Sequence, residues 1–103
     1  MFQISTFKYM VIKQNDDGKN GVFFVGEYGD RLGELDYTWR DKNVIIINHT
    51  EVSEELEGHG VGKQLVERVV EFARETDSTI VPLCTFAKRV IDMTPEFQDV
   101  LKK

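Results

Sequence analysis

The chain has 103 residues, 41% of them hydrophobic and 30% charged, which is the composition of one folded domain and not of a disordered segment. The formal net charge of −5 disfavours a general nucleic-acid-binding protein, because neutralising phosphates requires a basic surface. Apolar runs such as Val44 to Ile47 are far shorter than the ~20 residues of a membrane span, and the single cysteine, Cys84, allows no intrachain disulfide. We therefore expect one domain, residues 1–103, in the cytoplasm, with no affinity for membranes or nucleic acids.

The first part of the chain predicts strands that are joined by tight turns. Stretches 9–14, 21–27 and 31–40 are apolar or alternate between apolar and polar residues. Turns at 15–20 and 28–30, rich in Asn, Asp and Gly, separate these stretches. This order predicts an antiparallel meander.

The third stretch predicts a strand with one buried face. Leu35, Tyr37 and Trp39 alternate with polar residues, so we expect them to share the face that packs on the core. Gly33 interrupts the alternation, and we predict a β-bulge at that position.

Residues 44–52, VIIINHTEV, predict a fourth strand of a different kind. It begins with four consecutive β-branched residues and has no alternation, which indicates a central strand that is covered on both faces. It then becomes polar at Asn48, His49, Thr50 and Glu51. A buried strand that turns polar at its C-terminal end is typical of a functional site.

The second half of the chain predicts a helix, a strand and two further helices. Residues 62–75 carry an apolar stripe at helical spacing, and residues 79–83 form a short apolar run. Residues 86–93 and 94–103 predict helices, the second with Thr94 as its N-cap. The fold class is therefore α+β / α/β: a four-stranded antiparallel meander, a glycine loop, a helix, a parallel fifth strand and C-terminal helices.

The stretch EELEGHGVGKQL, residues 54–65, lies between the fourth strand and the long helix. The N-terminus of a helix offers unpaired N–H groups and the positive end of the helix dipole, and glycines let an anion approach the backbone. This predicts a phosphate or pyrophosphate site with Lys63 as an added charge; the alternative is a tight turn and nothing more. Gln64 does not fit a P-loop, and Lys63 stands where a dinucleotide fingerprint requires glycine.

The segment EGHGVG resembles the acetyl-CoA loop of the GNAT superfamily of N-acetyltransferases, whose pattern is Gln/Arg-x-x-Gly-x-Gly/Ala. Glu57, Gly60 and Gly62 occupy the named positions. The strand end HTEV, residues 49–52, and the strand end PLC, residues 82–84, are similar to those of the smallest single-domain members. The resemblance covers residues 7–93 and implies the GNAT fold.

The resemblance also implies acetyl-CoA as co-substrate, no metal, and an unidentified amine as acceptor. The residues that it implies for binding acetyl-CoA are Val52, Gly58, His59, Gly60, Val61, Gly62 and Lys63.

Three features depart from the family pattern. Glu57 places a negative charge where the pattern has Gln or Arg, so we expect weaker but not abolished binding of the pyrophosphate. Tyr9, Tyr28 and Tyr37 all precede the loop, which leaves the position of the usual general-acid tyrosine vacant. Only a short turn separates the first two strands, so we expect an open acceptor side.

Cys84 and His49 are the candidate catalytic residues. Cys84 lies between a strand and a predicted helix start, where the pKa of a thiol can fall, and His49 lies near the end of the neighbouring strand. The pair could act as acid and base, or Cys84 could be acetylated transiently as a nucleophile. The alternatives are that Cys84 is a small buried hydrophobe and that His49 is a satisfied polar residue. A metal site at His49, His59 and Cys84 is disfavoured, because these residues lack the spacing of a close ligand pair.

The leading hypothesis, which the resemblance implies, is an enzyme of the acyltransferase class: an acetyl-CoA-dependent N-acetyltransferase. Two alternatives stay open: a non-catalytic module that binds or senses acyl-CoA, and a protein-interaction domain that uses the exposed edge of its meander. The sequence defines neither the acceptor amine nor the oligomeric state.

Overall fold

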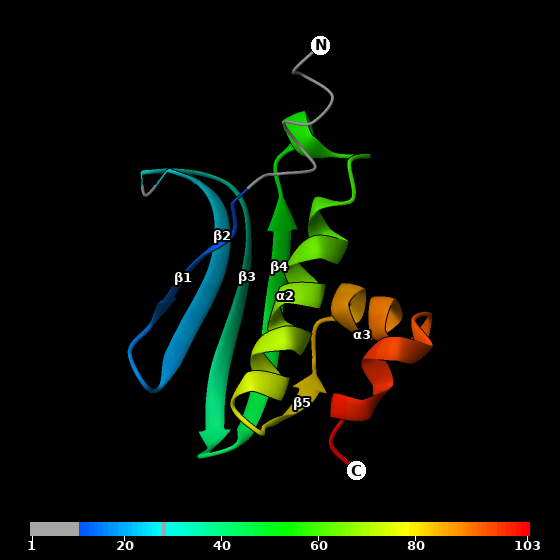
Figure 1. Ribbon diagram of the computed structural model, residues 1–103. Helices are drawn as coiled ribbons and strands as arrows, with labels where there is room; N and C mark the ends of the chain where they lie inside the picture. The colour runs from blue at the N-terminus through cyan, green and yellow to red at the C-terminus, as the bar shows by residue number, and fades with distance from the viewer. Residues whose placement is uncertain (1–10, 28) are drawn as a thin grey trace.

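In the part of the chain that the structure describes, five strands form one sheet in the order of the sequence (Figure 1). The structure is a computed structural model that describes residues 11–27 and 29–103, so Tyr9, Tyr28 and the predicted strand start at residues 9 and 10 lie outside the described residues. The strands are β1 (Lys13–Asp16), β2 (Asn20–Glu27), β3 (Asp30–Asp41), β4 (Val44–Val52) and β5 (Thr79–Pro82). Neighbouring strands from β1 to β4 are antiparallel and β5 is parallel to β4, which confirms the predicted mixed sheet.

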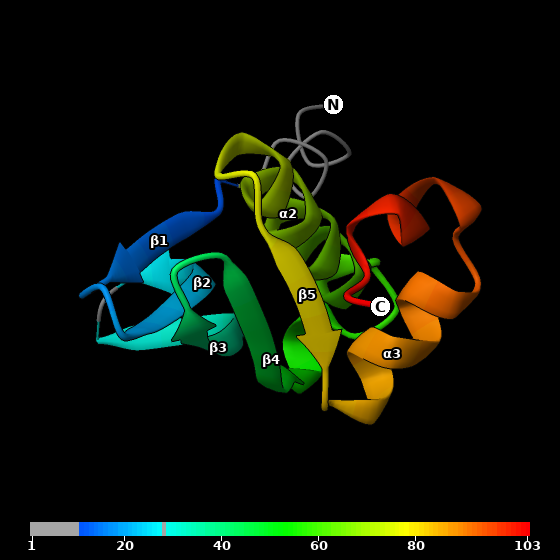
Figure 2. The same cartoon turned by 90° about the horizontal axis from the view of Figure 1, so that it is seen from below.

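A long helix, α2 (Val61–Glu75), connects β4 to β5 and crosses one face of the sheet (Figure 2). Two shorter elements, α3 (Thr85–Asp92) and η2 (Pro95–Val100), lie beside α2 at the β5 end of the sheet. The apolar stripe of α2 is buried against the sheet, as its spacing predicts: Val61, Gly62, Leu65, Val66, Val69, Val70 and Ala73.

Strands β3 and β4 each contribute buried side chains to the core. On β3, Leu35 and Tyr37 are buried and Trp39 packs against the core that α2 covers. On β4, which lies between β3 and β5, Ile45 and Ile47 are fully buried. The continuous apolar pattern therefore identifies an interior strand correctly, but Ile46 is only partly buried, so the prediction that both faces are covered holds only in part.

The bulge predicted at Gly33 lies one residue away. Gly33 pairs regularly with Val25 on β2 and with Val52 on β4, whereas Leu32 is skipped in the pairing with β2. A Cβ atom at residue 33 would lie 3.3 Å from methyl carbons of Val25 and Val61. Close packing between the sheet and the start of α2 therefore accounts for this glycine, and the prediction of a bulge at it was wrong.

The C-terminal segment differs from the predicted helix over residues 94–103. The 3₁₀ helix η2 covers only Pro95–Val100, and Leu101 then forms a parallel bridge with Ile80 of β5. The Thr94 hydroxyl donates to the Val90 carbonyl at 2.7 Å and so satisfies the end of α3, not the start of η2. The bridge between Leu101 and Ile80 of β5 therefore takes the place of the last part of the helix that the local sequence predicts.

A short 3₁₀ helix, η1 (Glu54–Leu56), precedes the glycine loop and was not predicted. Ser53 caps it, because its hydroxyl accepts a hydrogen bond from the Glu55 N–H. Leu56 anchors the segment in the core with 5% of its surface exposed. Among the described residues, the helices are all too short or too polar to cross a bilayer.

Candidate functional site

Strand β4 contains a bulge at its midpoint. In the ladder with β3, Tyr37 pairs with Ile47, but the next pair is Asp36 with His49, so Asn48 is skipped. The Asn48 side chain donates a hydrogen bond of 2.8 Å to the Thr38 hydroxyl. A bulge of this kind adds one residue to one strand and changes the direction in which the following side chains point.

The bulge determines which polar residues of β4 face α2. Beyond it, Thr50 lies opposite Leu35, which belongs to the core beneath α2, and His49 lies opposite Asp36. Directly opposed residues share a face of the sheet. Thr50 therefore faces α2, and His49 faces the other side.

The pairing between β4 and β5 ends halfway along β4. The last pair is Ile47 with Pro82, and the N–H groups of Leu83 and Cys84 then both donate to the Ile47 carbonyl, at 3.0 and 3.1 Å. Proline carries no N–H group that could extend the ladder. Within the described residues, β4 thus continues from residue 48 to 52 with no strand paired to its β5 side, which leaves an open strand edge.

The three glycines of the loop have two different structural roles. Gly58 and Gly60 have φ values of 87° and 75°, which side chains rarely adopt, and no atom lies within 4 Å of where their Cβ atoms would be. Gly62 lies within α2, where a Cβ atom would come to 2.7 Å from the Phe86 ring. The first two glycines shape the turn, and the third admits the packing of α3 against α2.

The start of α2 presents a group of backbone donors. The first hydrogen bond of the helix runs from the Gln64 N–H to the Gly60 carbonyl, at 3.0 Å. The N–H groups of Val61, Gly62 and Lys63 precede it and have no acceptor within the helix. The helix dipole adds positive potential at this point, so the loop can bind an anion.

A cavity of about 330 Å³ lies between this loop and α3. Its lining combines the loop backbone with apolar side chains: Val52, Leu56, Glu57, Gly58, Gly60, Val61, Gly62, Lys63, Phe86 and Val90. Of the residues predicted to bind acetyl-CoA, all but His59 belong to this lining; His59 lies in the exposed loop itself. The sequence did not indicate Phe86 and Val90, because only the packing of α3 brings them to the loop.

Cys84 lies at the predicted helix start, as the residue that immediately precedes α3. Its thiol donates to the Thr50 hydroxyl, with 3.5 Å between Sγ and Oγ1. Partial burial raises the pKa of this thiol, but the nearby N–H groups of Ala87 and Phe86 and the Thr50 hydroxyl outweigh that effect, so the pKa lies below its usual value. The two N–H groups favour the thiolate without completing a cap hydrogen bond.

The structure does not place His49 in contact with Cys84. The imidazole is exposed, and its Nε2 atom lies 3.6 Å from a carboxylate oxygen of Glu51. The bulge turns His49 toward the face of the sheet opposite α2, whereas Cys84 packs on the core side. The residue that meets Cys84 is Thr50, which the sequence reading did not assign to the site.

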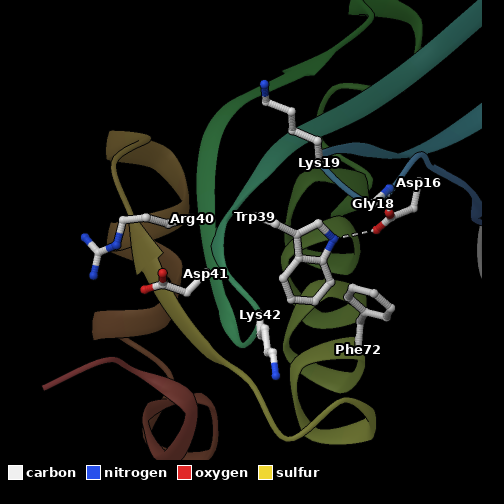
Figure 3. Close-up of a pocket in the computed structure, with 8 residues that line it drawn as sticks. All are labelled: Asp16, Gly18, Lys19, Trp39, Arg40, Asp41, Lys42 and Phe72. Atoms are coloured by element: carbon white, nitrogen blue, oxygen red, sulfur yellow. Dashed lines mark hydrogen bonds between the residues drawn. The ribbon is translucent and has the colours of Figure 1, made fainter.

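A second hollow lies at the end of the sheet remote from the glycine loop (Figure 3). It measures about 660 Å³, and Trp39 and Phe72 form its apolar wall. Asp16 already accepts hydrogen bonds there from the Trp39 Nε1–H and the Tyr37 hydroxyl, at 2.9 and 2.6 Å. The basic side chains Lys19, Arg40 and Lys42 point in three different directions, so they do not converge on one ligand. We therefore assign the candidate site to the glycine loop and the open edge of β4.

The part of the chain that the structure describes contains no set of side chains that could bind a metal ion. No group of three or more His, Cys, Asp or Glu side chains lies close enough to bind an ion there. The donors at the site are backbone N–H groups, a hydroxyl and a thiol, which suit an anionic ligand better than a cation.

Comparison with known proteins agrees with this geometry. A family model described as GCN5-related N-acetyltransferase matches residues 22–100. A GCN5-like protein of Staphylococcus aureus is 40% identical, with a TM-score of 0.73 over 90% of this chain and 88% of the other. No curated protein sequence matches the chain.

Two more distant structures share the fold. A GNAT family acetyltransferase of Elizabethkingia anophelis with acetyl-CoA bound has 14% identity and a TM-score of 0.59, over 71% of this chain and 63% of the other. An aminoglycoside N-acetyltransferase in complex with CoA also has 14% identity and a TM-score of 0.59, over 80% and 87% of the two chains. With the family model matching most of its length, the chain belongs to the GCN5-related N-acetyltransferase family.

Proposed function

We propose that this protein is an N-acetyltransferase that transfers the acetyl group of acetyl-CoA to an amine. The observation that carries the proposal is the open edge of β4, which has the anion-binding loop at one end and the Cys84 thiol beside it. In a member of the GCN5-related family, this arrangement supports binding of a long anionic thioester along the strand.

The residues of the loop fit the charged part of acetyl-CoA. The N–H groups of Val61, Gly62 and Lys63 would hold the pyrophosphate, and the exposed Lys63 ammonium adds a positive charge. Local donors are needed because the net charge of −5 repels anions. Glu57 lines the same cavity and opposes this binding with its carboxylate.

The remaining lining fits the uncharged arm. The side chains of Val52, Leu56, Phe86 and Val90 provide apolar contact in the cavity. The backbone groups of residues 48–52 that face away from β3, apart from the Thr50 N–H beside the Cys84 thiol, can hydrogen-bond the amides of the arm as a further strand would. His59 would contribute through the loop backbone.

Acetyl-CoA supplies an activated thioester, and the protein must manage the protons of the transfer. In one route, Cys84 gives its thiol proton to the departing CoA thiolate and recovers the proton that the amine loses. In the other route, the Cys84 thiolate attacks the thioester carbonyl and displaces CoA as its thiolate. The amine then attacks acetyl-Cys84 and displaces the Cys84 thiolate, and the proton that the amine loses passes to a thiolate. The lowered pKa of the thiol is compatible with both routes.

His49 would act from the other face of the sheet. An amine that enters the gap between β4 and β5 beyond Ile47 from the side opposite α2 would pass His49 before it reaches the thioester beside Cys84. There His49 would accept a proton from the amine, with Glu51 beside the imidazolium that forms. We thus propose separate roles for the two residues in place of a direct pair.

The test is CoA release from acetyl-CoA in the presence of a panel of amines. We expect turnover that falls at least tenfold in Cys84→Ala, whereas Leu83→Ala, at a neighbouring position with an exposed side chain, keeps it. Mass spectrometry of the intact protein separates the routes, because an acetyl adduct that requires Cys84 indicates the nucleophilic one. Tight binding of acetyl-CoA without turnover on any amine would indicate a non-catalytic acyl-CoA module instead. Absence of binding would refute the proposal.

A further inference from the structure

We infer that Thr50 is a positioning residue whose hydroxyl holds the Cys84 thiol at the open edge of β4. The inference rests on the proposed function for its catalytic meaning. Its structural basis is the hydrogen bond of 3.5 Å between Sγ and Oγ1 together with the bulge that brings Thr50 to this face.

The bulge is the first reason to assign this role to Thr50. If Asn48 were paired regularly in the ladder instead of bulged, strand alternation would continue from Ile47 so that His49 faces α2 and Thr50 faces away. The bulge reverses these two directions. A bulge interrupts the regular pairing of the ladder at one position. Bulges next to functional sites commonly change the direction in which a side chain points.

The second reason is that both partners are fixed from other directions. The Cys84 N–H donates to the Ile47 carbonyl at 3.1 Å, which ties the backbone of Cys84 to β4 three residues before Thr50. Thr50 is itself held in the ladder opposite Leu35. Because neither backbone is free to drift, the contact between thiol and hydroxyl has a defined geometry.

A hydroxyl suits both protonation states of the thiol. It accepts a hydrogen bond from the S–H group and, after rotation, donates one to the thiolate. The largest influences on the ionisation of Cys84 are partial burial, which raises its pKa, and the N–H of Ala87 and the Thr50 hydroxyl, which lower it. Among these hydrogen-bonding groups, the Thr50 hydroxyl belongs to a side chain and the others belong to the backbone. A substitution can therefore remove the hydroxyl without altering the backbone.

The test compares Thr50→Val, Thr50→Ser and His49→Gln by the pH dependence of iodoacetamide alkylation in the absence of acetyl-CoA. Cys84 is the single cysteine of the chain, so alkylation reports on it alone. Thr50→Val keeps the branched shape but lacks the hydroxyl, and we expect alkylation near neutral pH to slow about three- to tenfold as the thiol pKa rises. Thr50→Ser should restore the wild-type rate. His49→Gln, one residue away on the opposite face, should leave it unchanged.

Melting temperatures show whether each variant is folded, and Thr50→Ala, which also lacks the hydroxyl, gives the decisive comparison with Thr50→Ser if Thr50→Val does not fold. An unchanged alkylation profile in folded Thr50→Val would overturn the inference, as would an equal change in Thr50→Ser. Because alkylation requires no acetyl transfer, the inference can hold even if the amine panel gives no turnover. If turnover is found, we expect kcat of Thr50→Val to fall and its pH profile to move with the alkylation profile, while KM for acetyl-CoA changes little.

Discussion

The contact between Gly62 and Phe86 gives a prediction that can be worked through in numbers. Alanine in place of glycine inside a helix gains about 1 kcal/mol of stability. At residue 62, however, the new Cβ would lie 2.7 Å from the Phe86 ring, which is too close for any real contact. Overpacking of this kind costs about 1–3 kcal/mol, so we expect Gly62→Ala to lower the free energy of unfolding by about 1 kcal/mol.

Removing the ring should reverse the sign of that effect. In a Phe86→Ala background nothing opposes the added methyl group, and Gly62→Ala should raise the free energy of unfolding by up to about 1 kcal/mol. The two positions would then be coupled by about 2 kcal/mol in a double-mutant cycle measured by urea unfolding. Gly60→Ala is the matched control: its φ of 75° should cost about 1–2 kcal/mol in both backgrounds, because no atom lies near its Cβ position.

Equal effects of Gly62→Ala in the two backgrounds would refute this reasoning. The glycine would then serve the conformation of the loop and not the packing of α3. The same variant also has a functional readout, because Phe86 lines the cavity beside the loop. If Gly62→Ala shifts the ring, it should weaken the binding of acetyl-CoA in isothermal titration calorimetry. This loss of affinity should depend on the Phe86 ring, whereas the effect of Gly60→Ala should be the same with and without the ring.

Two further predictions concern charge. Glu57→Arg should tighten the binding of CoA, because it replaces a carboxylate at the cavity by a guanidinium; an unchanged or lower affinity in calorimetry would contradict the placement of residue 57 beside the pyrophosphate. Partial burial raises the pKa of Asp16, but hydrogen bonds from Tyr37, Gly18 and Trp39 lower it more, so the folded-state pKa lies below the unfolded one. The stability that this carboxylate contributes is therefore present above the unfolded pKa of about 3.9 and is lost as the pH falls through the folded value. Urea unfolding between about pH 7 and pH 2 should show a smaller loss in Asp16→Asn, and equal losses in both proteins would contradict this assignment.

Much of the fold follows from local pattern. The alternation in β3, the continuous apolar run that opens β4 and the helical stripe of α2 each predicted an element that the structure contains. The position of the glycine loop between β4 and α2 followed from the same patterns. These features are local because a strand or helix reveals its buried face in its own residue spacing.

Features that depend on pairing between distant segments were not predictable. Leu101 continues beyond η2 to meet Ile80, a contact between residues far apart in the chain. The bulge at Asn48 depends on how β4 fits β3, and nothing in NHTEV marks which residue is skipped. Because the sequence does not mark this bulge, its pattern favours His49 and not Thr50 as the residue beside Cys84.

The separation of β5 from β4 and the bulge begin at the same point of β4, and in the proposed mechanism they give the two reactants separate places. After Ile47 the strand loses its β5 partner on one side and shifts its register by one residue on the other. The loss of β5 opens an edge along which one ligand can lie. The shift presents Thr50 and Cys84 on one face of that edge and His49 on the opposite face. A regular strand would place His49 and Thr50 the other way round, so the bulge, and not the order of residues, decides which side chain meets the thiol.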